Sequence, residues 1–488
     1  MSWRVALLSL VLAGCGAPHV NRERPIEILV STDAETLDPR HATDAVALRT
    51  TRLIHAGLIR LDPATLAPLP YAARSWSWLD DQTLSVTLRE DVRFLSGAPL
   101  RAAVVVATIT AFQSPAVGSR HARVVDAIGS ATAEGEHVVL FRLKRPHATL
   151  LTDLEIPILR ADEAAVPPRP DGSLDGLGPF VLKEQLAGAL TLLPATASVL
   201  PTPAHAITIR TVHDENARAL RMHAGRADIV VNGFSPTLLP ALEQAPGLSM
   251  QMRSGANLTH MIVRGDRGPL SDVRVRQALS LAIDRARLAR TLLAGHATPA
   301  DTLLPETHWA HVDAPPMRFD PAAAKAMLPA PLHLTLLTST DRLRGTIARQ
   351  IAQELKDVGI ELEVIPLELG TMIARLGAGD FELATLQMPE LTEPNVLRVF
   401  LHSSSFPPAG ANRGRVQDPE VDRLLDEGAS LRDPDARKRV YAALEARVRE
   451  KAWLLPLWHE DQVAITSARA KAFRPSAEGR WLDLAALP

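Results

Sequence analysis

The chain has 488 residues, nearly balanced charge and few aromatic side chains, and each property excludes something. A chain of this length is too long for a single core and predicts two or three lobes. The formal net charge of −2 at pH 7 argues against a general nucleic-acid or acidic-surface partner. Aromatic residues make up only 4% of the chain, so a ligand cleft would have few rings on which to stack.

The N-terminal stretch MSWRVALLSLVLAGC is typical of an export signal. Arg4 is followed by an apolar run over residues 5–12, which is too short to span a bilayer, and then by small residues. Leu-Ala-Gly-Cys at positions 12–15 resembles the lipobox of bacterial lipoproteins and ends at Cys15, the single cysteine of the chain. We therefore predict a signal peptide over residues 1–14 and a lipid anchor on Cys15.

The segment from residue 51 to 170 is rich in strand patterns. Closer to the N-terminus, IEILV at 26–30 also predicts a strand. Within the segment, Leu84, Val86 and Leu88 alternate with polar residues, which is the period of two of a half-buried strand. HVVLFRLKR, at 137–145, predicts a similar strand. The segment should therefore form a small strand-rich domain.

Two strand-helix-strand units lie far apart in the sequence. In the first, at 206–231, Asp214 should cap the helix and Gly225 should end it. In the second, at 332–367, Gly359 ends the helix. The strands of such units are parallel and lie in a buried sheet, so two distant units imply two α/β lobes.

Between these units, residues 272–293 place apolar side chains on one helical face. The side chains are Val275, Ala278, Leu279, Ala282 and Ile283.

We find no sequence motif that signals catalysis. HExxH, GxSxG, GxGxxG and Walker sequences are missing from the chain. Cysteine nucleophilic catalysis has no free thiol once Cys15 carries lipid. We therefore expect neither an enzyme nor a cofactor.

Two short patterns have a structural interpretation that we favour over a chemical one. His308 and His311 could share one face of a helical turn and bind a metal, but no further ligand lies close in sequence. Solvated or capping histidines fit better, and we predict no metal site. GLGPF, at 176–180, lacks the lysine and the following helix of a phosphate loop, which favours a backbone turn between domains.

A series of short motifs runs in a fixed order along nearly the whole mature chain. Together these motifs resemble the extracytoplasmic solute-binding proteins of ABC transporters, in the peptide and nickel class of family 5. Each motif is weak alone, but their order and spacing are specific. The motifs are ETLDP (35–39), HAGLIRLDP (55–63), LPYAARSWSWLDDQTLSVTLREDVRFLSGAPL (69–100), GLGPF, GRADIVV (225–231), DVRVRQALSLAIDRARLARTLLAG (272–295), FDPAAAKAMLP (319–329), LKDVGIELEV (355–364), DPEVDRLLDEG (418–428) and LLPLW (454–458).

The resemblance implies an α/β, bilobal fold like that of type II periplasmic binding proteins, with an additional strand-rich domain and a ligand cleft between the lobes. The lobes close on the ligand by hinge motion, and the closed form docks on a membrane permease. We expect the following parts: 1–14 signal peptide, 15–24 lipidated tether, 25–50 lobe I, 51–170 additional domain, 171–258 lobe I, 259–462 lobe II and 463–488 lobe I.

The resemblance also implies an acidic residue that pairs with the α-amino group of a peptide ligand, in a segment similar to Trp-x-x-Asp-x-x-Asp-Pro. The corresponding stretch is LQMPELTEPNVL, in which Glu390 and Glu393 occupy the acidic positions and Pro394 the proline. The tryptophan is missing, and both acids are one methylene longer than in the family pattern. Helix capping or solvation is the alternative role for each glutamate.

Further candidates for ligand contact come from three other segments. Arg264 stands where family members usually carry asparagine, and it could receive a ligand carboxylate or pair with Asp266 or Asp272. Arg413 and Arg415 could supply cations near the cleft or belong to a solvated loop. Ser31, Thr32 and Glu35 follow the first strand and could line the cleft from the other lobe.

We thus predict a monomeric, lipid-anchored receptor in the periplasm or on the cell surface. It would bind a peptide-like solute and hand it to an ABC permease and its ATPase, without any nucleic-acid partner. Two alternatives remain open. One is a receptor for nickel with a small chelator, for which His402 and His459 are the suggestive positions. The other is a signalling or scaffolding lipoprotein with a degenerate cleft.

Replacing the lipobox cysteine tests the anchor. Cys15→Ser removes the thiol that would be acylated, so the variant should lose its lipid and leave the membrane fraction. The measurement is fractionation with metabolic labelling by a fatty acid, compared with the unchanged chain. A Cys15→Ser protein that still carried lipid and sedimented with membranes would contradict the prediction.

Overall fold

The computed structural model describes residues 24–488, so Cys15, the predicted signal peptide and most of the predicted tether lie outside the described residues. In the described part, no helix is both long and apolar enough to cross a membrane.

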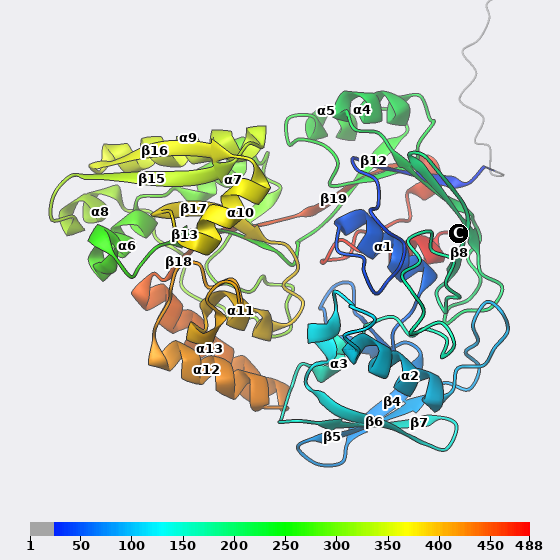
Figure 1. Cartoon of the computed structure of the whole chain (residues 1–488). Coiled ribbons are helices and arrows are strands. Elements are labelled where there is room, and N and C mark those ends of the chain that lie inside the picture. Colours follow the sequence, from blue (N-terminus) through cyan, green and yellow to red (C-terminus); the bar gives the residue numbers. More distant parts are fainter. Residues whose placement is uncertain (1–23) are drawn as a thin grey trace, which may run out of the picture.

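Lobe I is built on a seven-stranded sheet with β1 (Ile26–Val30) near its centre (Figure 1). β1 pairs in parallel with β10 (Ile207–Thr211) on one side and β11 (Ile229–Val231) on the other. α4 (Glu215–His223) connects β10 to β11, and the Asp214 carboxylate caps it by accepting from the Ala217 amide at 2.8 Å. This arrangement confirms the first predicted unit. The sheet also contains β8 (Phe180–Leu186), β9 (Ala189–Pro194), β12 (Leu248–Arg253) and β19 (Gln462–Ser467), and the lobe carries α1 (Ala45–Ile54) and α5 (Leu239–Glu243).

Lobe II is built on a six-stranded sheet in the order β14-β18-β13-β17-β15-β16. β15 (Leu332–Ser339) and β16 (Ile360–Leu367) are parallel neighbours, and α9 (Arg342–Asp357) connects them, which confirms the second predicted unit. Gly359, just after α9, has φ +98°, a backbone conformation that favours glycine. The other strands are β13 (Leu258–Val263), β14 (Ala297–Pro299), β17 (Leu383–Met388) and β18 (Leu454–Glu460), and the other helices are α6 (Val273–Leu281), α7 (Arg285–Leu292), α8 (Pro321–Met327), α10 (Leu369–Ala378), α11 (Leu397–Leu401), α12 (Pro419–Ser430) and α13 (Pro434–Lys451).

The apolar face predicted over residues 272–293 belongs to two helices, α6 and α7. The break between them occurs because Asp284 caps α7 and accepts from the Arg287 amide at 2.9 Å. All five predicted apolar residues are nevertheless buried in the core of lobe II.

The additional domain contains a four-stranded antiparallel sheet in the order β4-β5-β7-β6, as the strand patterns predicted. Leu84, Val86 and Leu88 of β5 are buried in its core. The expected boundary at residues 50/51 falls within α1, whose Leu53 and Ile54 pack in lobe I. The elements are β2 (Ile59–Leu61), β3 (Pro68–Pro70), β4 (Ala73–Trp78), β5 (Thr83–Leu88), β6 (Ile128–Glu134) and β7 (Val138–Leu143), with α2 (Ala102–Gln113) and α3 (Leu150–Asp153).

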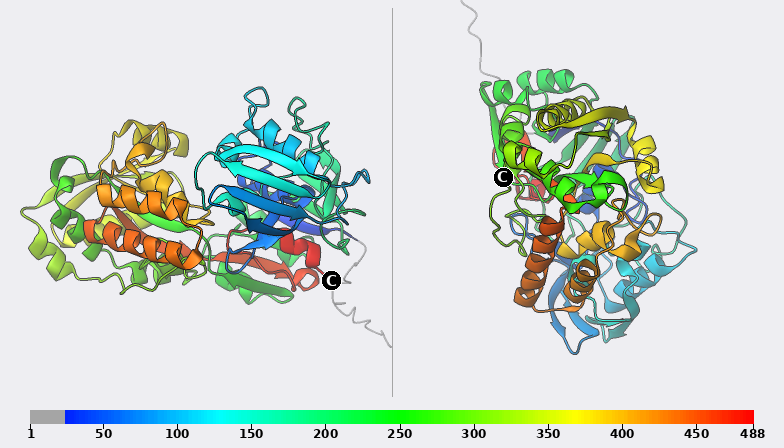
Figure 2. Two further views of the ribbon diagram at one scale, coloured as in Figure 1. Left: turned by 90° about the horizontal axis from the view of Figure 1, so that it is seen from below. Right: turned by 90° about the vertical axis from the view of Figure 1, so that its left-hand side faces the viewer.

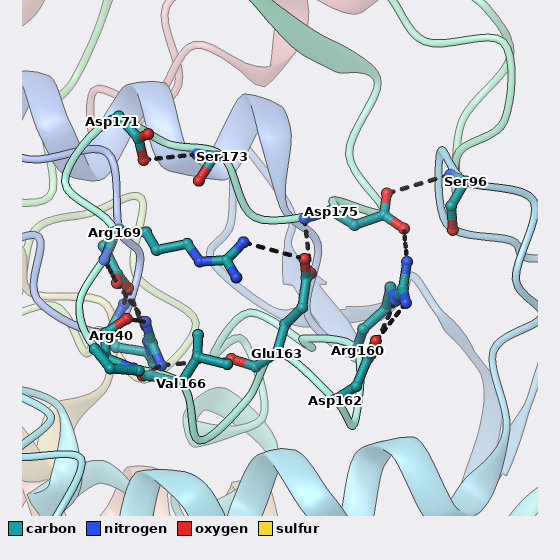
Figure 3. A network of polar contacts seen from close by, with 12 residues as sticks. Arg40, Ser96, Arg160, Asp162, Glu163, Val166, Arg169, Asp171, Ser173 and Asp175 are labelled. Atoms are coloured by element: carbon teal, nitrogen blue, oxygen red, sulfur yellow. Dashed lines mark hydrogen bonds and ion pairs between the residues drawn. The ribbon is translucent and has the colours of Figure 1, made fainter.

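A polar network fastens the additional domain to lobe I (Figure 3). The fully buried Arg40 pairs with Asp38 and donates to the carbonyl oxygens of Ala164, at 3.0 Å, and Val166, at 2.7 Å. The Asp38 carboxylate also accepts from the Arg169 amide at 2.9 Å. Because each buried charge is paired and bonded to backbone, this joint is rigid.

Two chain crossings join lobe I to lobe II. One runs from β12 to β13 and the other from β18 to β19, where only Asp461 separates the two strands. The Asn257 side chain bridges the crossings by donating to the Glu460 carbonyl at 2.7 Å and accepting from the Glu460 amide at 2.8 Å. Figure 2 shows lobe II on one side of this joint and lobe I with the additional domain on the other.

The predicted GLGPF turn closes against the end of α1. A Cβ added at Gly178 would lie 2.4 Å from the Leu53 carbonyl oxygen, and the Gly178 amide donates to the Ile54 carbonyl at 2.8 Å. Only glycine permits this approach, which confirms a structural turn at this place.

Gly178→Ala should therefore destabilise the protein by about 3 kcal/mol, because the new methyl group meets backbone that cannot move aside. Gly345→Ala is the matched control, since its Cβ would meet only the end of the Arg349 side chain, at 3.4 Å. In that helix interior, alanine should be neutral or stabilise by up to about 1 kcal/mol. Urea unfolding midpoints measure both, and equal midpoints for the two variants would refute the packing argument.

Candidate functional site

A cavity of about 240 Å³ lies where lobe I, the additional domain and lobe II meet. Because all three parts contribute to its wall, its shape depends on how the lobes are placed. Among its lining residues are Thr51, Arg52 and His55 from the end of α1, His121 and Glu155 from the additional domain, and Glu390, Thr392 and Glu393 from lobe II. We call it the interlobe cavity.

The arginines near the cavity come from helix α1, and Glu390 comes from the loop that follows β17. Arg49 and Arg52 are three residues apart on α1 and thus share a face of that helix. Glu390 follows β17, whose last residue, Met388, pairs with Leu258 beside the crossing between the lobes. The Leu391 amide donates to the Ala256 carbonyl at 2.7 Å, which fixes the loop.

Glu390 is a carboxylate held between arginines of lobe I without a hydrogen bond from any described residue. Its Oε2 atom lies 3.9 Å from Nη1 of Arg52 and 3.9 Å from Nη2 of Arg480. Nη1 of Arg52 is buried and also lacks a hydrogen-bond partner among residues 24–488. Glu390 of lobe II and Arg52 of lobe I thus form a long ion pair across the joint, and neither of these two atoms has a hydrogen bond from the described residues.

Arg480 is more tightly engaged than Arg52. It forms an ion pair with Glu155 of the additional domain. Burial opposes its charge, but the carboxylates of Glu155, Glu478 and Glu390 outweigh that and raise the pKa of Arg480 above its usual value. Arg480 is therefore a fixed cation in the wall of the cavity.

Glu393 lines the same cavity, but its carboxylate is already engaged by other residues of the protein. Its carboxylate caps the turn at Pro394–Val396 by accepting from the Asn395 amide at 3.3 Å, and it forms an ion pair with the buried Arg437. This capping is the alternative that the sequence left open. A ligand role for Glu393 stays a prediction.

Arg264 lies at the far end of β13 from Glu390. It follows Val263, roughly 20 Å along the strand from Leu258 at a rise of about 3.3 Å per residue. Its guanidinium pairs with Asp266 at 2.6 Å, one of the two partners considered from the sequence. Its ligand role also stays a prediction.

Arg413 and Arg415 lie at the same far end, because the Gly265 amide donates to the Gly414 carbonyl at 3.3 Å. Nε of Arg413 is buried and has no partner among the described residues. Arg415 has φ +57° and stacks 4.8 Å above the ring of Phe406. Neither arginine lines the interlobe cavity.

Ser31, Thr32 and Glu35 are exposed in the loop after β1. The Glu35 amide donates to the Asp44 carboxylate at 3.1 Å, which ties this loop to the start of α1, whereas Arg52 and His55 lie at its end. The three residues are not in the wall of the interlobe cavity.

The histidines considered for metal serve other contacts. His402 accepts from the Ser404 amide at 3.0 Å, and Nδ1 of His459 lies 2.5 Å from the Asn257 carbonyl oxygen. Nδ1 of His308 accepts from the Ala310 amide at 3.0 Å, and Nδ1 of His311 lies 3.0 Å from the Leu304 carbonyl oxygen. In the described part of the chain, no three His, Cys, Asp or Glu side chains are grouped to hold a metal ion.

Sequence reasoning missed Arg52, Arg480 and His55. The only available signal for Arg52 was its spacing from Arg49 on one helix, and exposed helices often show such pairs. Arg480 and His55 are more than 400 residues apart in the chain, so no local pattern could have joined them.

Lobe II also contacts the additional domain directly. Arg432 of lobe II donates to the Asp80 carbonyl at 2.9 Å, pairs with Asp81 and lies 5.3 Å from the ring of Trp78. The Ala148 amide donates to the Ala429 carbonyl at 2.8 Å. α12 and the additional domain therefore touch, as Figure 1 also shows.

Two lobes joined by paired crossings, with charged groups facing each other across the joint, define a two-lobed solute-binding protein. The comparison with family models agrees: residues 67–404 match the bacterial extracellular solute-binding proteins, family 5. The chain belongs to this family, which confirms the resemblance found in the sequence.

Relatives and solved structures span nearly the whole chain. A probable D,D-dipeptide-binding periplasmic protein of Escherichia coli is 25% identical and aligns with 97% of this chain and 96% of its own length. An ABC transporter substrate-binding protein of Listeria monocytogenes has a TM-score of 0.85 at 20% identity, covering 95% and 98% of the two chains. A Campylobacter jejuni protein solved with Ni(L-His) has a TM-score of 0.80 at 20% identity, covering 94% and 98%. The two solved structures share the fold.

The two glutamates of the cavity should differ in their effect on stability. Glu393→Gln leaves the buried Arg437 without its ionic partner and should lower the free energy of unfolding by about 3 kcal/mol. Glu390→Gln removes no hydrogen bond but two long, partly exposed ion pairs, and should change it by less than about 1 kcal/mol. Urea unfolding without ligand measures both, and an equal loss in the two variants would show that Glu390 is also structural.

Proposed function

We propose that the protein captures a peptide or peptide-like solute between its lobes and delivers it to an ABC permease and its ATPase. The observation that carries the proposal is Glu390, an anion at the joint of the lobes with no hydrogen bond from the described residues. A ligand ammonium requires such a partner, because an unpaired charge in a closed cleft is very costly.

The opposite wall suits the rest of a peptide. Nη1 of Arg52 can donate a hydrogen bond to a carbonyl or carboxylate oxygen of a peptide. This buried atom would then have the hydrogen-bond partner that the described residues do not provide. Because Glu390 belongs to lobe II and Arg52 to lobe I, a ligand that bonds both favours the closed form over the open one.

The relatives support this ligand class. Similar proteins include the probable D,D-dipeptide-binding protein and a glutathione-binding protein of Escherichia coli, the latter 24% identical over 92% of both chains. We further propose that the receptor is a monomer without catalytic activity. It would be held at a membrane, in the periplasm or on the cell surface, by lipid on Cys15.

Thermal melting with matched peptides tests the function. Peptides of two to five residues with a free N-terminus should raise the melting temperature, because they bind only the folded protein. The same peptides with an acetylated N-terminus should not, since the ammonium is gone. Glu390→Gln should weaken peptide binding at least tenfold, about 1.4 kcal/mol. Glu361→Gln, an exposed site on β16, is the control that should leave binding unchanged.

Other outcomes point to other functions. Equal binding of acetylated peptides would remove the amine site at Glu390. A shift with nickel–histidine alone would favour the metal-complex receptor. No shift with any of these ligands would favour a scaffolding lipoprotein with a degenerate cleft.

A further inference from the structure

A second and larger cavity, of about 400 Å³, lies between lobe I and the additional domain. It is enclosed by the segment from the end of α1 to Tyr71 and by residues 476–486. No residue of lobe II is among its described lining residues, and it shares Arg52, His55, Glu155 and Arg480 with the interlobe cavity as a common wall. We call it the lobe I cavity.

The lobe I cavity collects buried polar atoms that have no hydrogen-bond partner among residues 24–488. The hydroxyl of Tyr71, Nε1 of Trp481 and Nε of Arg480 are unpaired donors. Oε2 of Glu478 is an unpaired acceptor, and both ring nitrogens of His55 are unpaired. These five residues are at most 8% exposed. Each unsatisfied buried group costs about 1–3 kcal/mol, so a ligand recovers a large free energy if small side-chain rotations turn several of these almost fully covered atoms toward it.

The charges in the wall cancel. Three arginines, at positions 52, 60 and 480, face three acidic residues, at positions 155, 478 and 483. His55 adds no charge at neutral pH, because burial lowers its pKa to about 4. A charged ligand would therefore find no unbalanced counter-charge, and an uncharged ligand fits better.

Most of the rest of the wall is apolar and includes Ile59, Leu61, Leu200, Pro201 and Leu482. The volume falls in the range of about 300–1,000 Å³ that is usual for sites of small molecules. An apolar enclosure with a few convergent polar groups is the common form of such sites.

We infer that the lobe I cavity is a second ligand site, which takes a small uncharged amide with an apolar body. The amide carbonyl accepts from the Tyr71 hydroxyl and the Trp481 indole, the amide N–H donates to the Glu478 carboxyl group, and the apolar body packs on Leu61 and Leu482. This site goes beyond the proposed function, because it needs neither Glu390 nor closure of the lobes.

Binding of phenylacetamide to the mature protein tests this inference, with phenylacetate as the charged control of equal size. The amide should raise the melting temperature and the acid should not. Tyr71→Phe should weaken amide binding at least fivefold, since it removes one donor and keeps the ring. Tyr441→Phe is the matched control, because it removes the other buried, unpaired tyrosine hydroxyl, in lobe II. It should leave amide binding unchanged.

A filling variant adds an independent check. Ala485→Phe places a ring in the cavity and should abolish amide binding, and if this variant fails to fold, Tyr71→Phe still decides. Glu390→Gln should leave amide binding unchanged while it weakens peptide binding, so the two sites can fail separately. The inference is overturned if phenylacetamide gives no shift, as for a cavity that holds only water. An equal shift with phenylacetate, or unchanged binding in Tyr71→Phe, would overturn it too.

Discussion

The pairing of two chain crossings is the constraint on which the rest of this structure depends. Asn257 bonds both the carbonyl and the amide of Glu460, so the crossings from β12 to β13 and from β18 to β19 behave as one unit. On the lobe I side of the crossings, the Gln462 side chain accepts a hydrogen bond of 2.5 Å from the Asn232 side chain. Since both crossings lie beside the loop that carries Glu390, a rotation about them moves Glu390 relative to Arg52 and also moves Arg432 relative to Asp81.

The three parts of the molecule differ in how firmly they are joined. Lobe I and the additional domain share the buried pair of Asp38 and Arg40, whose charges are bonded to backbone (Figure 3). The additional domain and lobe II share Arg432 and Asp81, which are more exposed and therefore hold less strongly. The natural division of motion is thus lobe II against the other two parts, which is what a receptor that closes on a solute needs. The lobe I cavity lies wholly on the rigid side of this division.

Local sequence patterns predicted those elements in which one rule dominated. Asp214 and Gly359 mark helix ends whether or not the rest of the chain is present. The rules failed where two of them competed. α2 was not predicted, because its run AAVVVATITAFQ is rich in β-branched residues and has no polar face. Residues 272–293 looked continuous on their apolar face, but the capping carboxylate of Asp284 begins a new helix.

The sequence by itself determined the family, the two α/β lobes and the strand-rich domain. These features follow from periodicity, caps and the order of motifs, all of which are local or linear. Only the tertiary structure decided which glutamate has no hydrogen bond from the described residues, because Arg437 reaches Glu393 and not Glu390. It also decided that Arg52 and Arg480 face Glu390, and that Arg264 lies at the opposite end of its strand. Such facts depend on residues tens to hundreds of positions apart meeting in space, and no spacing in the chain encodes them.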